Sequence, residues 1–148
     1  MRSPYIGPMD DSTPPPLLGL ALRHAHVRAS RAFAEELQPL GLENPVAGVV
    51  LQLGRLGPQT QRRLVEILGS EKSAMVRYID ALEARGLVRR EPHPTDRRAQ
   101  WIALTEAGQT ILTEVQQAMQ RAEEQLLARL SPEERALFHE LLVRFSYG

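Results

Sequence analysis

The chain has 148 residues, of which 43% are hydrophobic and only 5% aromatic, so it is long enough for one packed domain with an aliphatic core. It has no cysteine, which excludes disulfides, thiolate metal sites and a cysteine redox switch. No apolar run approaches the roughly 20 residues of a membrane-spanning helix, and the N-terminus lacks the apolar core of a signal peptide. We therefore expect a cytoplasmic protein with no membrane partner.

The formal net charge is zero, yet the positive charge is concentrated in the middle of the chain. Residues 55–98 carry ten Lys or Arg against six acidic residues, whereas residues 1–54 and 99–148 each carry an excess of acid. A basic block inside an otherwise neutral or acidic chain is typical of a segment that contacts nucleic acid. Chance scatter would also explain so small an excess, so the charge distribution alone leaves both explanations open.

Residues 1–16 contain five prolines and few side chains that could pack, which predicts a disordered arm. From residue 17 the pattern becomes that of a folded domain, which we expect to continue to residue 148. Its first helix is predicted over residues 17–40, where apolar residues recur at three- and four-residue spacing. Gly41 is expected to end this helix.

Three short helices are predicted next, over residues 44–55, 60–68 and 70–85. The residues expected to cap their N-termini are Asn44, Thr60 and Ser70. Each helix is followed by a chain-breaking glycine, namely Gly57 (with Pro58), Gly69 and Gly86.

A β-hairpin and two further helices complete the predicted order. Strands over residues 87–90 and 100–104 flank a polar, turn-rich loop. Thr105 is expected to cap a long helix that runs to about residue 130, and the sequence Ser-Pro-Glu-Glu from residue 131 predicts a capping box at the start of the last helix. The predicted fold class is mainly α with a small β-hairpin wing.

Two short helices joined by a tight turn containing Gly69 have the geometry of a helix-turn-helix. On the second helix, Met75, Ile79 and Leu82 have the spacing of a buried stripe. A different face suits the major groove, because its basic, hydroxyl and small apolar side chains can reach phosphates or base edges. The residues of the two helices that we expect to contact DNA are Thr60, Gln61, Lys72, Ser73, Val76 and Arg77. The alternative is a polar face that meets only solvent.

Arginines lie on both sides of the predicted hairpin loop, with Arg89 and Arg90 before it and Arg97 and Arg98 after it. A hairpin tip beside a recognition helix can insert an arginine into the minor groove, where the negative potential is strongest at A·T-rich tracts. We expect all four arginines to contact DNA. Asp96 would be a poor DNA contact, and we expect it to pair with an arginine and brace the loop. The alternative is a hairpin that is basic only for solubility.

The sequence from Ile79 to Arg90 (IDALEARGLVRR) resembles the MarR family of multiple antibiotic resistance regulators. So does the sequence from Pro92 to Gly108, in which an Asp-x-Arg motif is followed by Leu-Thr. These motifs cover about residues 60–108, and the predicted helix order extends the resemblance to about residues 17–147. The resemblance is fairly specific, because several motif positions match in order.

The resemblance implies a winged helix-turn-helix transcription regulator that binds double-stranded DNA, usually as a repressor released by a small ligand. In the family's wing pattern, Arg98 would enter the minor groove and Asp96 would brace the wing. Trp101 departs from the family, which more often has an aliphatic or polar residue on this strand. We expect Trp101 to pack rather than to act.

The DNA-binding unit is expected over residues 45–105, which leaves residues 17–41 and 106–148 for another role. Apolar stripes at the two chain ends fit an intertwined interface between two copies: Leu18, Leu22, Ala25, Leu137, Leu141 and Phe145. We therefore predict a homodimer on a palindromic operator, with two recognition helices about 34–36 Å apart. The alternative is that these stripes pack on their own domain.

Family members bind small molecules between the dimerisation helices and the DNA-binding unit. The resemblance therefore makes His24, His26, Arg28 and Arg31 candidates for binding a small aromatic or phenolic effector, although a solvated helix face would look the same. No metal site is expected, because His24 and His26 are two residues apart and would point away from each other on a helix.

Catalysis and cofactors are not expected. The chain has no Gly-rich phosphate loop, zinc-protease motif or Gly-x-Ser-x-Gly motif. The second function compatible with these patterns is a winged helix that mediates protein–protein contacts without specific DNA binding. An arginine at the position of Arg98 argues against that reading, because such a module has no need of it.

Overall fold

The computed structural model describes residues 14–148, so residues 1–13, most of the expected Pro-rich arm, lie outside the described part. In chain order the elements are α1 (Leu18–Leu37), the 3₁₀ turn η1 (Gln38–Leu40), α2 (Asn44–Leu56), β1 (Gln59–Thr60), α3 (Gln61–Leu68), α4 (Lys72–Ala84), β2 (Val88–Pro92), β3 (Gln100–Leu104), α5 (Glu106–Leu126) and α6 (Pro132–Tyr147). The predicted fold class, mainly α with a small β wing, is confirmed.

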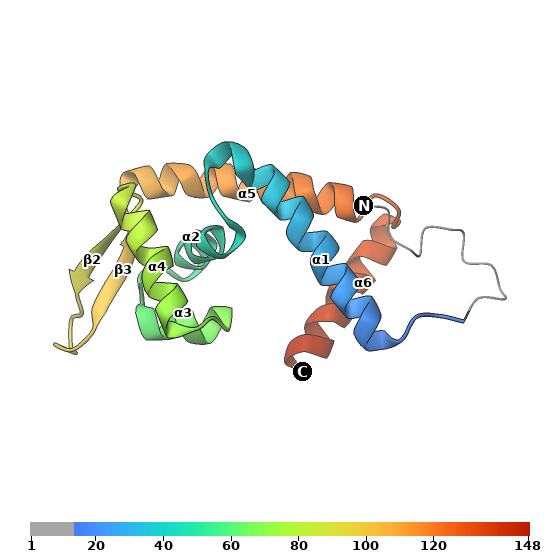
Figure 1. Cartoon of the computed structure of the whole chain (residues 1–148), viewed down its shortest axis with the longest axis horizontal. Helices are drawn as coiled ribbons and strands as arrows, with labels where there is room; N and C mark the ends of the chain where they lie inside the picture. The colour runs from blue at the N-terminus through green and yellow to red at the C-terminus, as the bar shows by residue number, and fades with distance from the viewer. Residues whose placement is uncertain (1–13) are drawn as a thin grey trace.

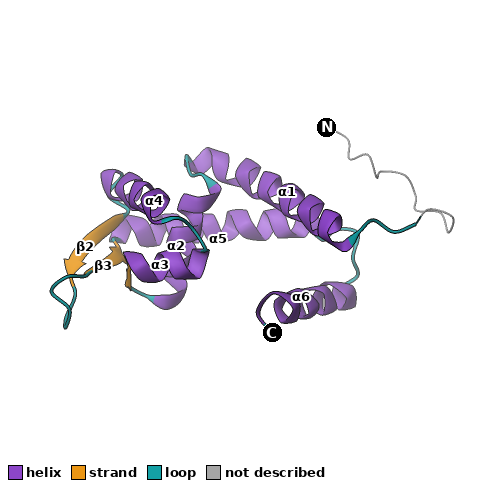
Figure 2. Ribbon diagram, turned by 60° about the horizontal axis from the view of Figure 1, so that its bottom comes forward, coloured by secondary structure: helices purple, strands orange, loops and turns teal. Residues whose placement is uncertain are grey.

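The two long helices α1 and α5 lie side by side and form the spine of the molecule (Figures 1 and 2). An ion pair of 2.8 Å between Arg121 Nε of α5 and Glu36 Oε2 of α1 joins them. The sheet lies at one end of this spine and α6 at the other, so the wing and the last helix are far apart (Figure 1). Within residues 14–148 no helix is both long and apolar enough to cross a membrane.

The sheet has three antiparallel strands in the order β1-β3-β2, one more than predicted. β1 contains only Gln59 and Thr60, which pair with Ile102 and Trp101 of β3. Two residues are too few to show the alternating pattern of a strand, so the sequence carried no signal for β1. Its effect is to attach the hairpin directly to the start of α3.

The core is a single apolar cluster centred on α2 and α4. The predicted stripe of Met75, Ile79 and Leu82 is fully buried, with 0% exposure at each residue. Val49 and Val50 of α2 are also fully buried in the same cluster. Burial of this stripe orients α4, because the opposite face of the helix is then turned to solvent.

Three of the predicted helix caps are confirmed. Thr60 Oγ1 accepts the main-chain N–H of Arg63 at 3.1 Å, and Thr105 Oγ1 accepts that of Gly108 at 3.0 Å. Ser131 begins α6 with the predicted capping box. Each of these caps uses a partner three residues away, so its signal lies within one short stretch of sequence.

The other two predicted caps, Asn44 and Ser70, are wrong. Glu43 occupies the cap position of α2 without a side-chain hydrogen bond, and the Nδ2 of Asn44 donates a 2.8 Å hydrogen bond to the carbonyl of Ser30 in α1. α4 begins two residues after Ser70, with Glu71 at the cap position, and the Ser70 hydroxyl is buried in the turn without a hydrogen-bond partner among the described residues. At α2 a tertiary contact thus replaces the predicted local cap.

The ends of the long helices also differ from prediction. α1 stops at Leu37 and gives way to the 3₁₀ turn, because Pro39 cannot continue the α-helical hydrogen-bond ladder. Gly41 ends this turn with φ of 66°, as predicted for a terminating glycine. α5 stops at Leu126, four residues before the expected end.

Gly108, in the first turn of α5, lies against the main chain of Leu87. A Cβ added at Gly108 would meet the Leu87 carbonyl oxygen at 2.0 Å, which requires the backbone to move. We expect Gly108→Ala to lower the free energy of unfolding by about 1–3 kcal/mol through overpacking. Gly48→Ala is the matched control, because a Cβ there makes an ordinary 3.7 Å contact with Leu68. Thermal melts should move in opposite directions, since Gly48→Ala favours helix by about 1 kcal/mol.

Candidate nucleic-acid interface

The helix-turn-helix consists of α3 and α4, joined by a turn in which Gly69 adopts φ of 61°. Burial of one side of α4 leaves Lys72, Ser73, Val76 and Arg77 exposed on its first two turns. Val76 is 36% exposed, which leaves its methyl groups available for contact with a thymine methyl group. The guanidinium of Arg77 lies 6.0 Å above the ring of Tyr78.

The base of the wing is tied to the recognition helix through Arg90. Its guanidinium forms ion pairs with Asp80 (2.7 Å) and Glu83 of α4, and its side chain is only 23% exposed. Arg89 is more exposed, yet it donates to the carbonyl of Leu104 at 3.1 Å and pairs with Glu91. Arg89 and Arg90, which were predicted to contact DNA, therefore also make contacts within the protein.

At the tip of the wing, Arg97 and Arg98 are exposed. Neither guanidinium has an ion-pair partner within residues 14–148. Asp96 Oδ1 accepts the main-chain N–H of Arg98 at 2.9 Å, so the carboxylate holds the main chain of this arginine rather than its side chain. The arginine side chains are left available for a partner.

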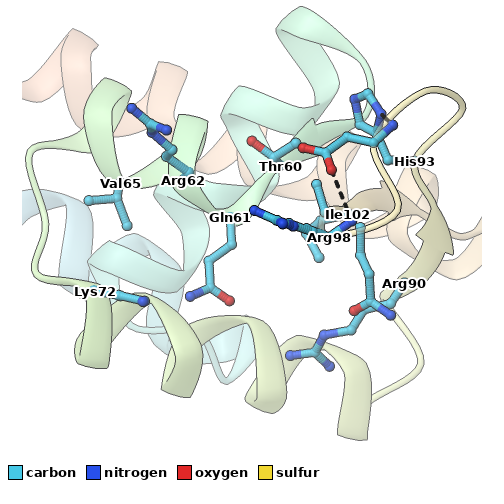
Figure 3. A pocket seen from close by; sticks show the side chains of 12 residues that line it. Thr60, Gln61, Arg62, Val65, Lys72, Arg90, His93, Arg98 and Ile102 are labelled. Carbon is cyan, nitrogen blue, oxygen red and sulfur yellow. Dashed lines mark hydrogen bonds between the residues drawn. The ribbon is translucent and has the colours of Figure 1, made fainter.

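A groove of about 680 Å³ separates the helix-turn-helix from the wing. Its lining comprises Thr60, Gln61, Arg62, Val65, Lys72, Arg90, His93, Asp96, Arg98, Ala99, Gln100 and Ile102. Four of these side chains are cationic and only Asp96 is acidic. Arg90 is paired with Asp80 and Glu83, and Arg62 with Glu66, so Lys72 and Arg98 are the lining cations without an ion pair within residues 14–148, and they suit a polyanion. In Figure 3, Gln61, Lys72 and Arg98 converge on it from α3, α4 and the wing loop.

The groove therefore brings together six predicted site residues from separate segments: the expected DNA contacts Thr60, Gln61, Lys72, Arg90 and Arg98, and the expected wing brace Asp96. Ser73, Val76, Arg77, Arg89 and Arg97 do not line it. Sequence reasoning missed Arg62 and His93. Arg62 had a usable signal, because it follows two predicted contacts in the first turn of α3, whereas His93 had none beyond its place in a polar loop.

The candidate effector residues lie on α1, far along the spine from the groove (Figure 1). His24, His26, Arg28 and Arg31 are all exposed. Arg28 Nη2 reaches the carbonyl of Leu126 at the end of α5 (3.4 Å), and His26 Nε2 lies 3.5 Å from Ser30 Oγ. In the described part of the chain, no three His, Asp or Glu residues are placed to hold a metal ion.

Of the apolar stripes predicted at the two chain ends, Leu22 is half-buried, whereas Leu18, Ala25, Leu137, Leu141 and Phe145 are exposed. All of α6 is exposed except Arg135, which is half-buried. Exposed fractions of 42–63% are found on one side of this helix, at Leu137, Phe138, Leu141, Leu142 and Phe145. On α1, Leu18 is 66% exposed. So large an apolar surface is rare on a monomer and marks an interaction site.

A recognition helix, a sheet that bears arginines at its tip and a basic groove between them define a winged-helix DNA-binding protein of the class that regulates transcription. The model of the MarR family matches residues 40–99. A protein of Thauera aromatica, a candidate transcriptional regulatory protein for the hcr operon, is 30% identical over 128 residues, which are 86% of this chain and 77% of that protein. The chain belongs to the MarR family.

Solved structures agree with this assignment. The apo form of MarR from E. coli matches with a TM-score of 0.79 at 26% identity, over 89% of this chain and 98% of that chain. A cysteine-to-serine mutant of the same MarR, complexed with operator DNA, matches with a TM-score of 0.78 at 26% identity, over 86% of this chain and 92% of that one. The winged-helix fold predicted from the wing motif is thereby confirmed.

Proposed function

We propose that this protein is a homodimeric repressor that binds a palindromic operator and releases it when a small ligand binds. The basic groove is the observation that carries the proposal, because it joins an exposed helix face to an arginine wing within one surface. α4 would enter the major groove and Arg98 the minor groove, while a phosphate strand would cross between them near Lys72 and Arg62. The operator-bound MarR of similar fold supports this reading.

The dimer is supported by the exposed apolar side of α6 and by the same kind of surface at the start of α1. Two copies would bury these stripes against each other, and a two-fold axis would present two recognition helices to successive turns of DNA. In this arrangement residues 45–105 form the DNA-binding unit, while residues 17–41 and 106–148 form the dimerisation part.

Selection from a random DNA pool tests the proposal. We expect an imperfect palindrome of about 16–20 base pairs, as two half-sites one turn apart require. Log affinity should fall linearly with log salt, with a slope of roughly −4 if Arg62 and Lys72 of both protomers each neutralise one phosphate. A folded protein that enriches no palindrome would instead be the protein–protein module. A reporter gene downstream of the selected site should be repressed by the protein.

For the effector, we propose a small aromatic or phenolic anion that binds beside α1, where His26, Arg28 and Arg31 are exposed. Because Arg28 also touches the end of α5, a ligand there would act on both spine helices. The ligand must bind the DNA-incompetent dimer more tightly than the competent one. A tenfold loss of DNA affinity needs a coupling of about 1.4 kcal/mol.

Reciprocity makes the effector prediction testable. After a melting-shift screen, calorimetry with and without saturating operator should show that DNA weakens ligand binding by the same factor by which the ligand weakens DNA binding. Arg31→Gln should reduce ligand affinity and leave operator affinity unchanged, with Arg129→Gln as the control. If saturating operator DNA leaves the ligand affinity unchanged, the compound is not the inducer.

A further inference from the structure

The wing loop between β2 and β3 contains a histidine that the DNA-binding proposal leaves without a role. His93 Nδ1 accepts the main-chain N–H of Asp96 at 3.0 Å and that of Thr95 at 3.2 Å. Its ring stacks on Trp101 of β3, with ring centroids 4.6 Å apart and planes 27° apart. The side chain is half-buried and lines the basic groove beside Arg98 (Figure 3).

Both hydrogen bonds require Nδ1 to act as the acceptor. A nitrogen that accepts N–H groups must carry a lone pair, so in this arrangement the ring proton lies on Nε2. His93 thereby does what an Asn or Asp side chain does in an Asx turn, where an oxygen at the equivalent position accepts N–H groups two or three residues on. The side chain of His93 therefore stabilises the turn in the wing loop.

The stacking of His93 on Trp101 connects the turn of the wing loop to the helix-turn-helix. Trp101 is paired across the sheet with Glu91 of β2 on one side and with Thr60 of β1 on the other. Thr60 is the residue that caps α3. The ring of His93 therefore rests on a strand whose position is set by the start of the helix-turn-helix.

A further contact leads from His93 to the wing arginine. The N–H of Asp96 is held by His93, and the carboxylate of Asp96 holds the N–H of Arg98 at 2.9 Å. We propose that His93 is a positioning residue, which keeps the wing loop in the conformation that presents Arg98 to the minor groove. This inference rests on the proposed DNA-binding function. It also gives Trp101, the departure from the family pattern, a role as the surface that holds the ring.

Two substitutions separate the hydrogen bonds from the stack. His93→Asn keeps an acceptor at the position of Nδ1 and loses the ring, whereas His93→Phe keeps a ring on Trp101 and loses the acceptor. We expect His93→Phe to weaken operator binding about tenfold, the size expected for losing two main-chain hydrogen bonds that order the loop. His93→Asn should bind within about threefold of the unsubstituted protein, because the turn survives. Fluorescence anisotropy with the selected operator measures both.

A double-mutant cycle distinguishes positioning from a general loss of stability. In an Arg98→Ala background, His93→Phe should add less than about a twofold further loss, since it acts through Arg98. Ring ¹⁵N chemical shifts of the free dimer should show Nδ1 without a proton. Melting temperatures should fall by no more than a few degrees for either substitution, so both variants are folded when DNA binding is measured.

Three results would overturn the inference. The first is that His93→Phe binds the operator as tightly as the unsubstituted protein. The second is that the loss of operator affinity caused by His93→Phe adds fully to the loss caused by Arg98→Ala. The third is a protonated Nδ1 in the free protein. Failure of this inference can be distinguished from failure of the proposed function. If the unsubstituted protein fails to bind any DNA, the proposed function and the inference both fall. If the unsubstituted protein binds the operator and His93→Phe binds it equally tightly, only the role proposed for His93 is wrong.

Discussion

Replacing Leu137 and Leu141 together by glutamate is expected to convert the proposed dimer into a monomer and to weaken operator binding by about 100-fold or more. The two side chains are 53% and 42% exposed on the apolar side of α6 and contribute nothing to the protomer's own core. In a symmetric interface, the double substitution would bury four carboxylates without partners, which is strongly unfavourable. Loss of the second half-site then removes the gain from bivalent binding.

The protomer itself should remain folded, because no side chain of α6 is buried. Light scattering should report a monomer whose far-ultraviolet circular dichroism is unchanged, and anisotropy should report weak binding to a single half-site. Glu140→Gln is the matched control, because it lies on the same helix but outside the apolar stripe. A double variant that stays dimeric at micromolar concentration would show that the interface lies elsewhere.

Arg77→Ala and Arg98→Ala are expected to weaken operator binding in different ways. Arg77 projects from the exposed face of α4, and its loss should relax the preference at one base pair at a cost of about 1–3 kcal/mol if it makes a bidentate guanine contact. Arg98 lies at the tip of the wing, and its loss should be greatest on operators with A·T-rich flanks, where the minor groove is narrow and most negative.

Affinities for a panel of operators with changed half-site bases or changed flanks measure both effects. Arg98→Lys separates shape from charge, because lysine keeps the positive charge without the planar guanidinium. Arg129→Ala, in the turn after α5, is the control for a general loss of positive charge. Equal losses on every operator would mean that Arg77 and Arg98 touch only phosphate, and base recognition would then have to come from other residues.

Much of the fold was predictable because its signals are local. Helix periods, the caps at Thr60, Thr105 and Ser131, and the arginine-flanked hairpin each occupy a few consecutive residues. The buried stripe of α4 follows from spacing alone, and its burial leaves the predicted DNA-facing residues exposed. The candidate site was predictable in part, since three of its predicted groove residues, Arg90, Asp96 and Arg98, lie in the two segments that carry the family motif.

Errors arose where a side chain uses a distant partner instead of a local one. Asn44 binds the main chain of α1, fourteen residues back in the chain, and so does not cap α2. Strand β1 exists only because β3 pairs with it. Arg90 was predicted as a DNA contact. The sequence did not predict its ion pairs with Asp80 and Glu83, because they form only when the wing approaches α4.

The sequence by itself determined the class of this protein, because periodic burial, turn residues and a short motif specify a helix-turn-helix with a basic wing. Only the tertiary structure decided how the wing is held. His93 and Trp101 are eight residues apart, and they stack because the antiparallel register of β2 and β3 brings the strand and the loop together. Such contacts have no sequence signature, since their energy depends on geometry that forms only after the strands have paired.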